Sequence, residues 1–187
     1  PFDMPAGIVR LDIRYSVSQP RDAADLRALG STIDIGIFDP RGHEFGTGRG
    51  FRGWSGSDRE RFFIAEDGAT PGYLAGPLQP GEWNVILGLY HLADEGCDFT
   101  LDIELTEGRT KLPMADPPAL PGYLPALNNT PGWYRGDLQC HTHHSDAQGS
   151  LDTLLATART RGLDFLAVTD HNTVSHIHEF PAQAGQR

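Results

Sequence analysis

Positive charge and cysteine are both scarce in this sequence of 187 residues. Lysine and arginine together number 15, against 25 aspartates and glutamates, and the formal net charge is −10. A chain this acidic is repelled by phosphate backbones and anionic lipid surfaces, so we expect neither a nucleic acid nor a membrane as partner. The two cysteines, Cys97 and Cys140, are interpreted as a turn residue and a small apolar strand residue in different domains. Such usage is compatible with a reducing compartment.

Long apolar runs are also missing. No stretch approaches the roughly 20 apolar residues that are needed to span a bilayer. The opening residues, PFDMPAGIVR, lack the charged segment followed by an apolar segment that is typical of a signal peptide. We therefore expect a cytoplasmic protein. The sequence also contains no Gly-x-Ser-x-Gly motif, so the serine nucleophile of an α/β-hydrolase has no candidate here.

The first half of the chain alternates apolar and polar residues. In IVRLDIRYSV, residues 8–17, the alternation predicts a strand with one buried face. The same pattern recurs near residues 33–37, 83–89 and 99–105, and turn signals such as DPRG and QPGE separate the runs. Short alternating strands joined by turns predict a jelly-roll-like β-sandwich over residues 1–106. The expected core comprises Val9, Leu11, Ile13, Ile33, Ile35, Val85, Leu87, Leu101 and Ile103, with Arg10, Asp12 and Arg14 at the surface.

The second half has a different organisation. Residues 107–132 are rich in proline and do not alternate, which predicts an extended linker. In residues 133–187, GDLQCH predicts a short strand and LDFLAVTD predicts a buried one. Between them Ser150 is a candidate helix N-cap and Gly162 a candidate helix end. A strand, a helix and a second strand in close succession predict a βαβ unit. The apolar face of the helix is expected to comprise Leu151, Leu154, Leu155 and Ala158.

Polar side chains follow both predicted strands of this unit. Residues 141–146 follow the first strand, and Asp170, His171 and Asn172 follow the second. Because the strands of a βαβ unit are parallel, their carboxyl ends meet at one edge of the sheet. Imidazole and carboxylate groups are good ligands for zinc, manganese and iron. The sequence therefore predicts a divalent metal site at this edge.

The segments GDLQCHTHHSDA and GLDFLAVTDHNT resemble the first two motifs of the PHP (polymerase and histidinol phosphatase) superfamily of metallohydrolases. Together with the sandwich segments GFRGWSG and PGEWNVILGLY, the arrangement is most similar to the carbaryl-hydrolase-like branch. The resemblance implies that residues 133–187 are the opening βαβ portion of an α/β PHP-type barrel. It also implies hydrolysis of a small-molecule phosphoester, carboxyl ester or carbamate by metal-activated water, with one to three zinc, manganese or iron ions in the complete site.

The register of this resemblance assigns the site residues. It makes His141, Asp146 and His171 metal ligands, and it gives the catalytic role to Asp146 and His171. Gln139 stands where the family has its first metal-binding histidine. A rival register pairs His141 with His143, but it leaves the aspartate two residues too close. The remaining candidates are Gln139, His143 and His144 as further ligands, and Asp137, Asp170 and Asn172 as groups that orient the ligands.

The resemblance ends near Ser175, whereas a complete eight-fold barrel takes roughly 250 residues. We therefore expect the barrel to be completed by missing C-terminal residues, a companion fragment or a second copy of the chain. His176 and His178 are expected to be exposed. The alternative interpretation is a non-catalytic binding or interaction protein whose sandwich binds a carbohydrate or a partner beside a degenerate PHP remnant. Gln139 and the lack of the later family motifs favour this alternative.

Overall fold

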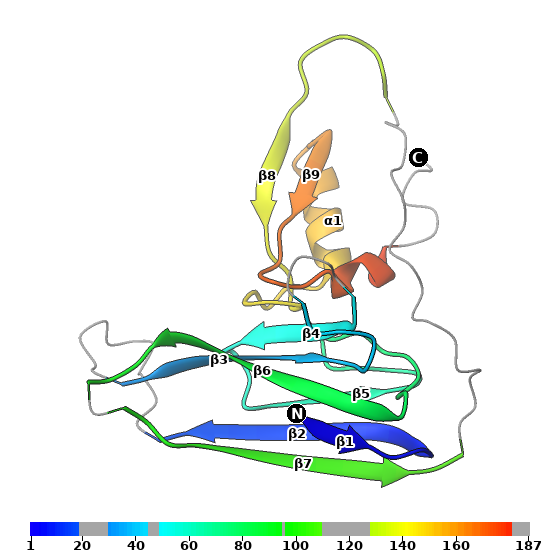
Figure 1. Cartoon of the computed structure of the whole chain (residues 1–187). Coiled ribbons are helices and arrows are strands. Elements are labelled where there is room, and N and C mark those ends of the chain that lie inside the picture. The colour runs from blue at the N-terminus through cyan, green and yellow to red at the C-terminus, as the bar shows by residue number, and fades with distance from the viewer. Residues whose placement is uncertain (19–29, 45–48, 95, 110–127, 181–187) are drawn as a thin grey trace.

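The regular secondary structure of the described chain is mostly β-sheet, with three sheets and one α-helix (Figure 1). The greater part of the predicted linker, residues 110–127, lies outside the described residues. The computed structural model describes residues 1–18, 30–44, 49–94, 96–109 and 128–180.

Two antiparallel sheets form the first part of the structure. Their strands are β1 (Phe2–Met4), β2 (Ile8–Val17), β3 (Thr32–Phe38), β4 (Phe51–Gly56), β5 (Arg61–Ala65), β6 (Gly81–His91) and β7 (Phe99–Glu107). One sheet has the order β1-β6-β3-β4, and the other has the order β5-β2-β7. Apolar side chains from both sheets pack into one cluster. The prediction of a β-sandwich is therefore confirmed for the described residues.

The sandwich core follows the alternation of the sequence at most positions. Leu11 and Ile13 of β2 are buried against Ile35 of β3, while Arg14 is exposed. The four predicted core residues of β6 and β7 are only partly buried, although they pack against the cluster. These four are Val85, Leu87, Leu101 and Ile103.

The prediction for Val9 is wrong. The pairing of β2 with β7 shifts register between Ile8 and Arg10, so the chain contains a bulge there. A bulge adds one residue and reverses the side to which the preceding side chain points. Ile8 is consequently buried in the core, and Val9 is only half-buried.

A buried arginine holds β4 in the sandwich, and the alternation pattern did not predict this strand. The guanidinium of Arg52 lies 3.4 Å from the carboxylate of Asp39. It also donates hydrogen bonds to the carbonyl oxygens of Leu74, Gly76 and Pro77. Because every one of these acceptors comes from a distant segment, Arg52 ties the loop after β5 to the sheet.

The second part of the structure contains β8 (Gly136–Cys140), α1 (Leu151–Thr160), β9 (Phe165–Val168) and the 3-10 helix η1 (Ser175–Glu179). β8 and β9 pair in parallel, so the predicted succession of strand, helix and parallel strand is present. Ser150 caps α1, since its side chain accepts the N–H of Thr153 at 3.2 Å. Gly162 follows the helix with a φ of +65°, a conformation that favours glycine.

One face of α1 is covered, but the parallel strands are open. Leu151 is buried, and the three other predicted residues of this face are half-buried. By contrast, Leu138 of β8 and Phe165 of β9 are large apolar side chains exposed to solvent. Among the described residues, no helix has the length and apolar character that crossing a membrane requires.

Replacing Leu11 with alanine should lower the free energy of unfolding by about 2–5 kcal/mol, because this side chain is 0% exposed. Leu89→Ala in β6 is the matched control, since it removes the same atoms from a side chain that is 64% exposed. The control should change the free energy of unfolding by less than about 0.5 kcal/mol. Urea unfolding followed by circular dichroism measures both. Equal losses of unfolding free energy in the two variants would contradict the assignment of Leu11 to the core face.

Candidate metal site

The carboxyl ends of the parallel strands face the sandwich. In Figure 1 the arrowheads of β8 and β9 both point toward the sandwich, and η1 lies between α1 and β4. Hydrogen bonds between described residues cross the junction. The N–H of Gly72 donates to Ser175 Oγ at 3.0 Å, Thr173 Oγ1 donates to the Gly72 carbonyl at 2.9 Å, and Arg59 Nη2 donates to the His143 carbonyl at 2.6 Å. Gly72 has a φ of +98°, so a side chain there would strain the backbone.

A buried carboxylate fixes the loop that follows β8. Asp170 lies two residues after the end of β9 and is buried. It accepts the backbone N–H of Thr142 at 2.6 Å, the hydroxyl of Thr142 at 2.7 Å and the hydroxyl of Ser145 at 2.7 Å. His176 Nδ1 lies 3.0 Å from its second oxygen. The end of one strand therefore holds the loop that extends from its neighbour.

Asp170 is held in its ionised form. Burial by itself raises the pKa of this carboxyl group. The hydrogen bonds from Ser145 and Thr142, together with the nearby His176, outweigh that effect and keep the pKa below its ordinary value. An ionised carboxylate accepts all of these donors at once, which explains why the loop can be packed so closely.

The structure brings the three residues predicted as metal ligands together. One ligand atom from each of His141, Asp146 and His171 lies within 4.8 Å of the other two. His141 Nδ1 is 2.7 Å from Asp146 Oδ1, and His171 Nε2 is 3.5 Å from Asp146 Oδ2. Desolvation raises the pKa of Asp146, but the hydrogen bonds from His141 and the backbone and the charges of both imidazoles keep it below its ordinary value.

These distances fit a tetrahedral ion. Metal–ligand bonds of about 2.0 Å place neighbouring ligand atoms about 3.3 Å apart. The separation between Asp146 and His171 already matches this value, and the direct hydrogen bond between His141 and Asp146 has to open by only roughly 0.6 Å. Asp146 and His171 are exposed, so an ion has access to them from solvent.

Other predicted site residues lie in different surroundings. The carboxylate of Asp137 accepts the backbone N–H of Gln139 at 3.0 Å, which is a contact within its own strand. Gln139 is exposed on β8. Asn172 is exposed, and its φ of +53° places it in a tight turn after His171. The predicted ligand role of Gln139 and the predicted orienting roles of Asp137 and Asn172 stay predictions.

His143 and His144 belong to a second group, together with Glu179 of η1. Glu179 was not among the predicted site residues, because its proximity arises only through the path of the chain after β9. The expectation that His176 is exposed is wrong: His176 is buried, since its imidazole packs against Asp170 and lies with its ring centroid 6.2 Å from that of His144. His178 is exposed, as expected.

Comparisons of this chain with protein-family models, with curated proteins and with solved structures find no match. The resemblance to the PHP superfamily therefore stays a prediction that depends on the two motifs. The geometry of the candidate site stands independently of it.

Replacing Asp170 with asparagine should lower the free energy of unfolding by roughly 2–4 kcal/mol, because an amide cannot accept all of the donors that the carboxylate accepts. Asp164→Asn is the control, since Asp164 is exposed and accepts the backbone N–H of Arg135. It should cost less than about 1 kcal/mol. Thermal unfolding of both variants checks this. A loss at Asp170 no larger than at Asp164 would show that the carboxylate does not fix the loop.

Proposed function

We propose that this chain carries the metal-binding part of a metal-dependent hydrolase that cleaves phosphoester, carboxyl ester or carbamate bonds. The observation that supports this best is the convergence of His141, Asp146 and His171 at the carboxyl ends of two parallel strands. Two imidazoles and one carboxylate are a typical donor set for a catalytic zinc ion, and they leave coordination positions for water and substrate. The exposure of Asp146 and His171 suits a small-molecule substrate that enters from solvent.

The proposed roles follow from the contacts. A divalent ion at this position would supply polarisation of the ester oxygen and a water molecule of lowered pKa. His141 and His171 hold the ion, and Asp146 lies between them with one oxygen toward each imidazole. Asp146 is the third ligand, and its carboxylate oxygen that does not bind the ion would be able to accept the proton of the attacking water. Asp170 acts on the site through the loop that carries His141 and Asp146.

The same proposal assigns β8, α1 and β9 to the opening βαβ portion of an α/β PHP-type barrel. Within the described residues β8 and β9 pair only with each other, so each strand presents a free edge. Free edges and the exposed side chains of Leu138 and Phe165 favour pairing with further strands. Those strands would come from additional C-terminal residues, a companion fragment or a second copy of the chain, and would supply the remaining metal ligands.

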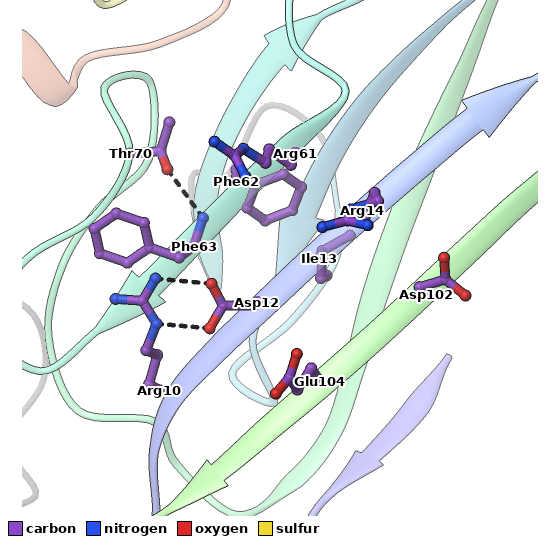
Figure 2. A pocket seen from close by; sticks show the side chains of 10 residues that line it. All are labelled: Arg10, Asp12, Ile13, Arg14, Arg61, Phe62, Phe63, Thr70, Asp102 and Glu104. Carbon is purple, nitrogen blue, oxygen red and sulfur yellow. Dashed lines mark hydrogen bonds and ion pairs between the residues drawn. The ribbon is translucent and has the colours of Figure 1, made fainter.

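A second candidate function is a binding module, and the outer face of the β5-β2-β7 sheet favours it. Figure 2 shows a hollow there in which the guanidinium of Arg10 lies against Phe63 and is hydrogen-bonded to Asp12. The distance from the guanidinium carbon to the ring centroid is 3.9 Å. Three arginines and three acidic residues line this hollow, so their charges balance. A neutral polar ligand such as a carbohydrate suits such a surface better than a polyanion does.

The hydrolase proposal predicts that the full chain takes up zinc or manganese and hydrolyses at least one of three probes: a nitrophenyl phosphate, a nitrophenyl acetate or an aryl carbamate. Asp146→Asn and His171→Asn should each lower kcat/KM by at least about 100-fold, because they remove a ligand and, at Asp146, the proton acceptor. His43→Asn, an exposed position in the sandwich, should leave kcat/KM unchanged. Metal analysis and steady-state kinetics provide the readouts.

The hydrolase proposal would be contradicted if the purified protein contains no stoichiometric metal and hydrolyses none of the probes after zinc or manganese is added. Gln139→His then separates the two candidates. A gain in metal content and activity in this variant identifies a weakened hydrolase site. Unchanged metal content and activity, combined with carbohydrate binding that Phe63→Ala abolishes, identifies the binding module.

A further inference from the structure

We propose that His143, His144 and Glu179 form a second cation site. The site binds zinc, cobalt or nickel, and the bound ion connects the loop after β8 to η1. The three ligand atoms lie within 4.8 Å of one another. This group shares no residue with His141, Asp146 and His171, so the proposal does not depend on the hydrolase function. Its role is to stabilise the junction with the sandwich.

The strongest indication is the imidazole of His144, which is only 5% exposed. Its Nδ1 lies 2.6 Å from Ser175 Oγ. Its Nε2 is buried and lies 2.8 Å from Glu179 Oε1, which is ion-pair distance, but the nitrogen has no hydrogen-bond partner of suitable geometry among the described residues. Buried polar atoms in native proteins nearly always have a partner, so this nitrogen requires an explanation.

Neither protonation state of Nε2 gives a well-aligned hydrogen bond. An N–H at Nε2 would lie 2.8 Å from the carboxylate oxygen but poorly aligned with it, whereas a lone pair would lie against an oxygen that also carries lone pairs. A cation between His144 and Glu179 satisfies the lone pair and the carboxylate together. The Nδ1–H of His144 then donates to Ser175 Oγ, which is the usual second contact of a metal-binding histidine.

His143 is oriented in the same way. Its Nδ1 lies 3.4 Å from the carbonyl oxygen of Gly149. Because a carbonyl oxygen can only accept, Nδ1 is the donor and Nε2 keeps its lone pair. This Nε2 lies 3.7 Å from Glu179 Oε1. Both imidazoles therefore present a nitrogen to one carboxylate oxygen, and their ring centroids are 4.6 Å apart.

The donor set and the distances select the class of ion. Ligands of a tetrahedral ion are about 3.3 Å apart, and the separations of 2.8 Å and 3.7 Å lie on either side of this value. Two imidazole nitrogens favour zinc, cobalt or nickel over magnesium and calcium, which prefer oxygen. Glu179 is 42% exposed, so the ion reaches the site from solvent and a water molecule completes its coordination.

The position of the site indicates what the ion does. The carbonyl of His143 accepts a hydrogen bond from Arg59, and Ser175 at the start of η1 accepts one from the N–H of Gly72. Both segments that the ion joins are thus docked on the sandwich. An ion that holds them to each other restrains the junction, since neither segment can leave the sandwich alone without stretching a metal bond.

The test is zinc binding by the full chain after treatment with a chelator, measured by equilibrium dialysis and metal analysis. Glu179→Gln and His143→Asn change exposed or half-exposed side chains, so folding is retained and circular dichroism verifies this. Each variant should bind one equivalent of zinc fewer than the unmodified chain, or bind that equivalent with an affinity at least about tenfold lower, because one of three ligands is lost. His178→Asn is the matched control on the same 3-10 helix and should bind zinc as the unmodified chain does.

Two further measurements separate this site from the proposed hydrolase site. Asp146→Asn should still bind zinc at the second site, where Glu179→Gln does not. This expectation does not depend on the outcome of the hydrolysis assays. Zinc should also slow amide hydrogen exchange at residues 175–179 in the unmodified chain and leave it unchanged in Glu179→Gln. Unchanged zinc affinity and stoichiometry in both Glu179→Gln and His143→Asn would overturn the proposal.

Discussion

The arrangement of both candidate metal sites depends on one buried carboxylate, that of Asp170. It stands at the end of β9 and accepts three hydrogen bonds from the loop that follows β8. That loop carries His141, His143, His144 and Asp146, so four of the six residues in the two groups are positioned through it. A loop this polar can lie against the rest of the chain only if its buried donors are satisfied, and an ionised carboxylate satisfies several at once.

The sandwich serves as the platform for this loop. Gly72 and Arg59, both from connections between sandwich strands, form the hydrogen bonds that cross the junction. The carboxyl ends of β8 and β9 consequently face the sandwich (Figure 1). Since the parallel strands themselves are open to solvent, the order at their ends comes from Asp170 and from these contacts with the sandwich.

The sequence pattern predicted the buried face of the sandwich strands and the strand ends that carry the candidate ligands. The burial of Leu11 and Ile13 follows from alternation, because one face of a strand in a sandwich has to be apolar. The closeness of His141 and His171 follows from parallel strand ends. Arg52 could not be predicted in the same way, since the carbonyl groups that satisfy it lie 22 to 25 residues further along the chain. The burial of His176 and the participation of Glu179 likewise arise from the path of η1, which no repeat or motif in the sequence indicates.

In the proposed hydrolase site, the ends of β8 and β9 bind a divalent ion between His141, Asp146 and His171. Anomalous diffraction from zinc-soaked crystals, recorded above and below the zinc absorption edge, tests it most directly. The account predicts an anomalous peak within about 2.3 Å of one ligand atom from each of these three residues. Crystals that show no peak there at saturating zinc, with the three side chains ordered, would contradict it.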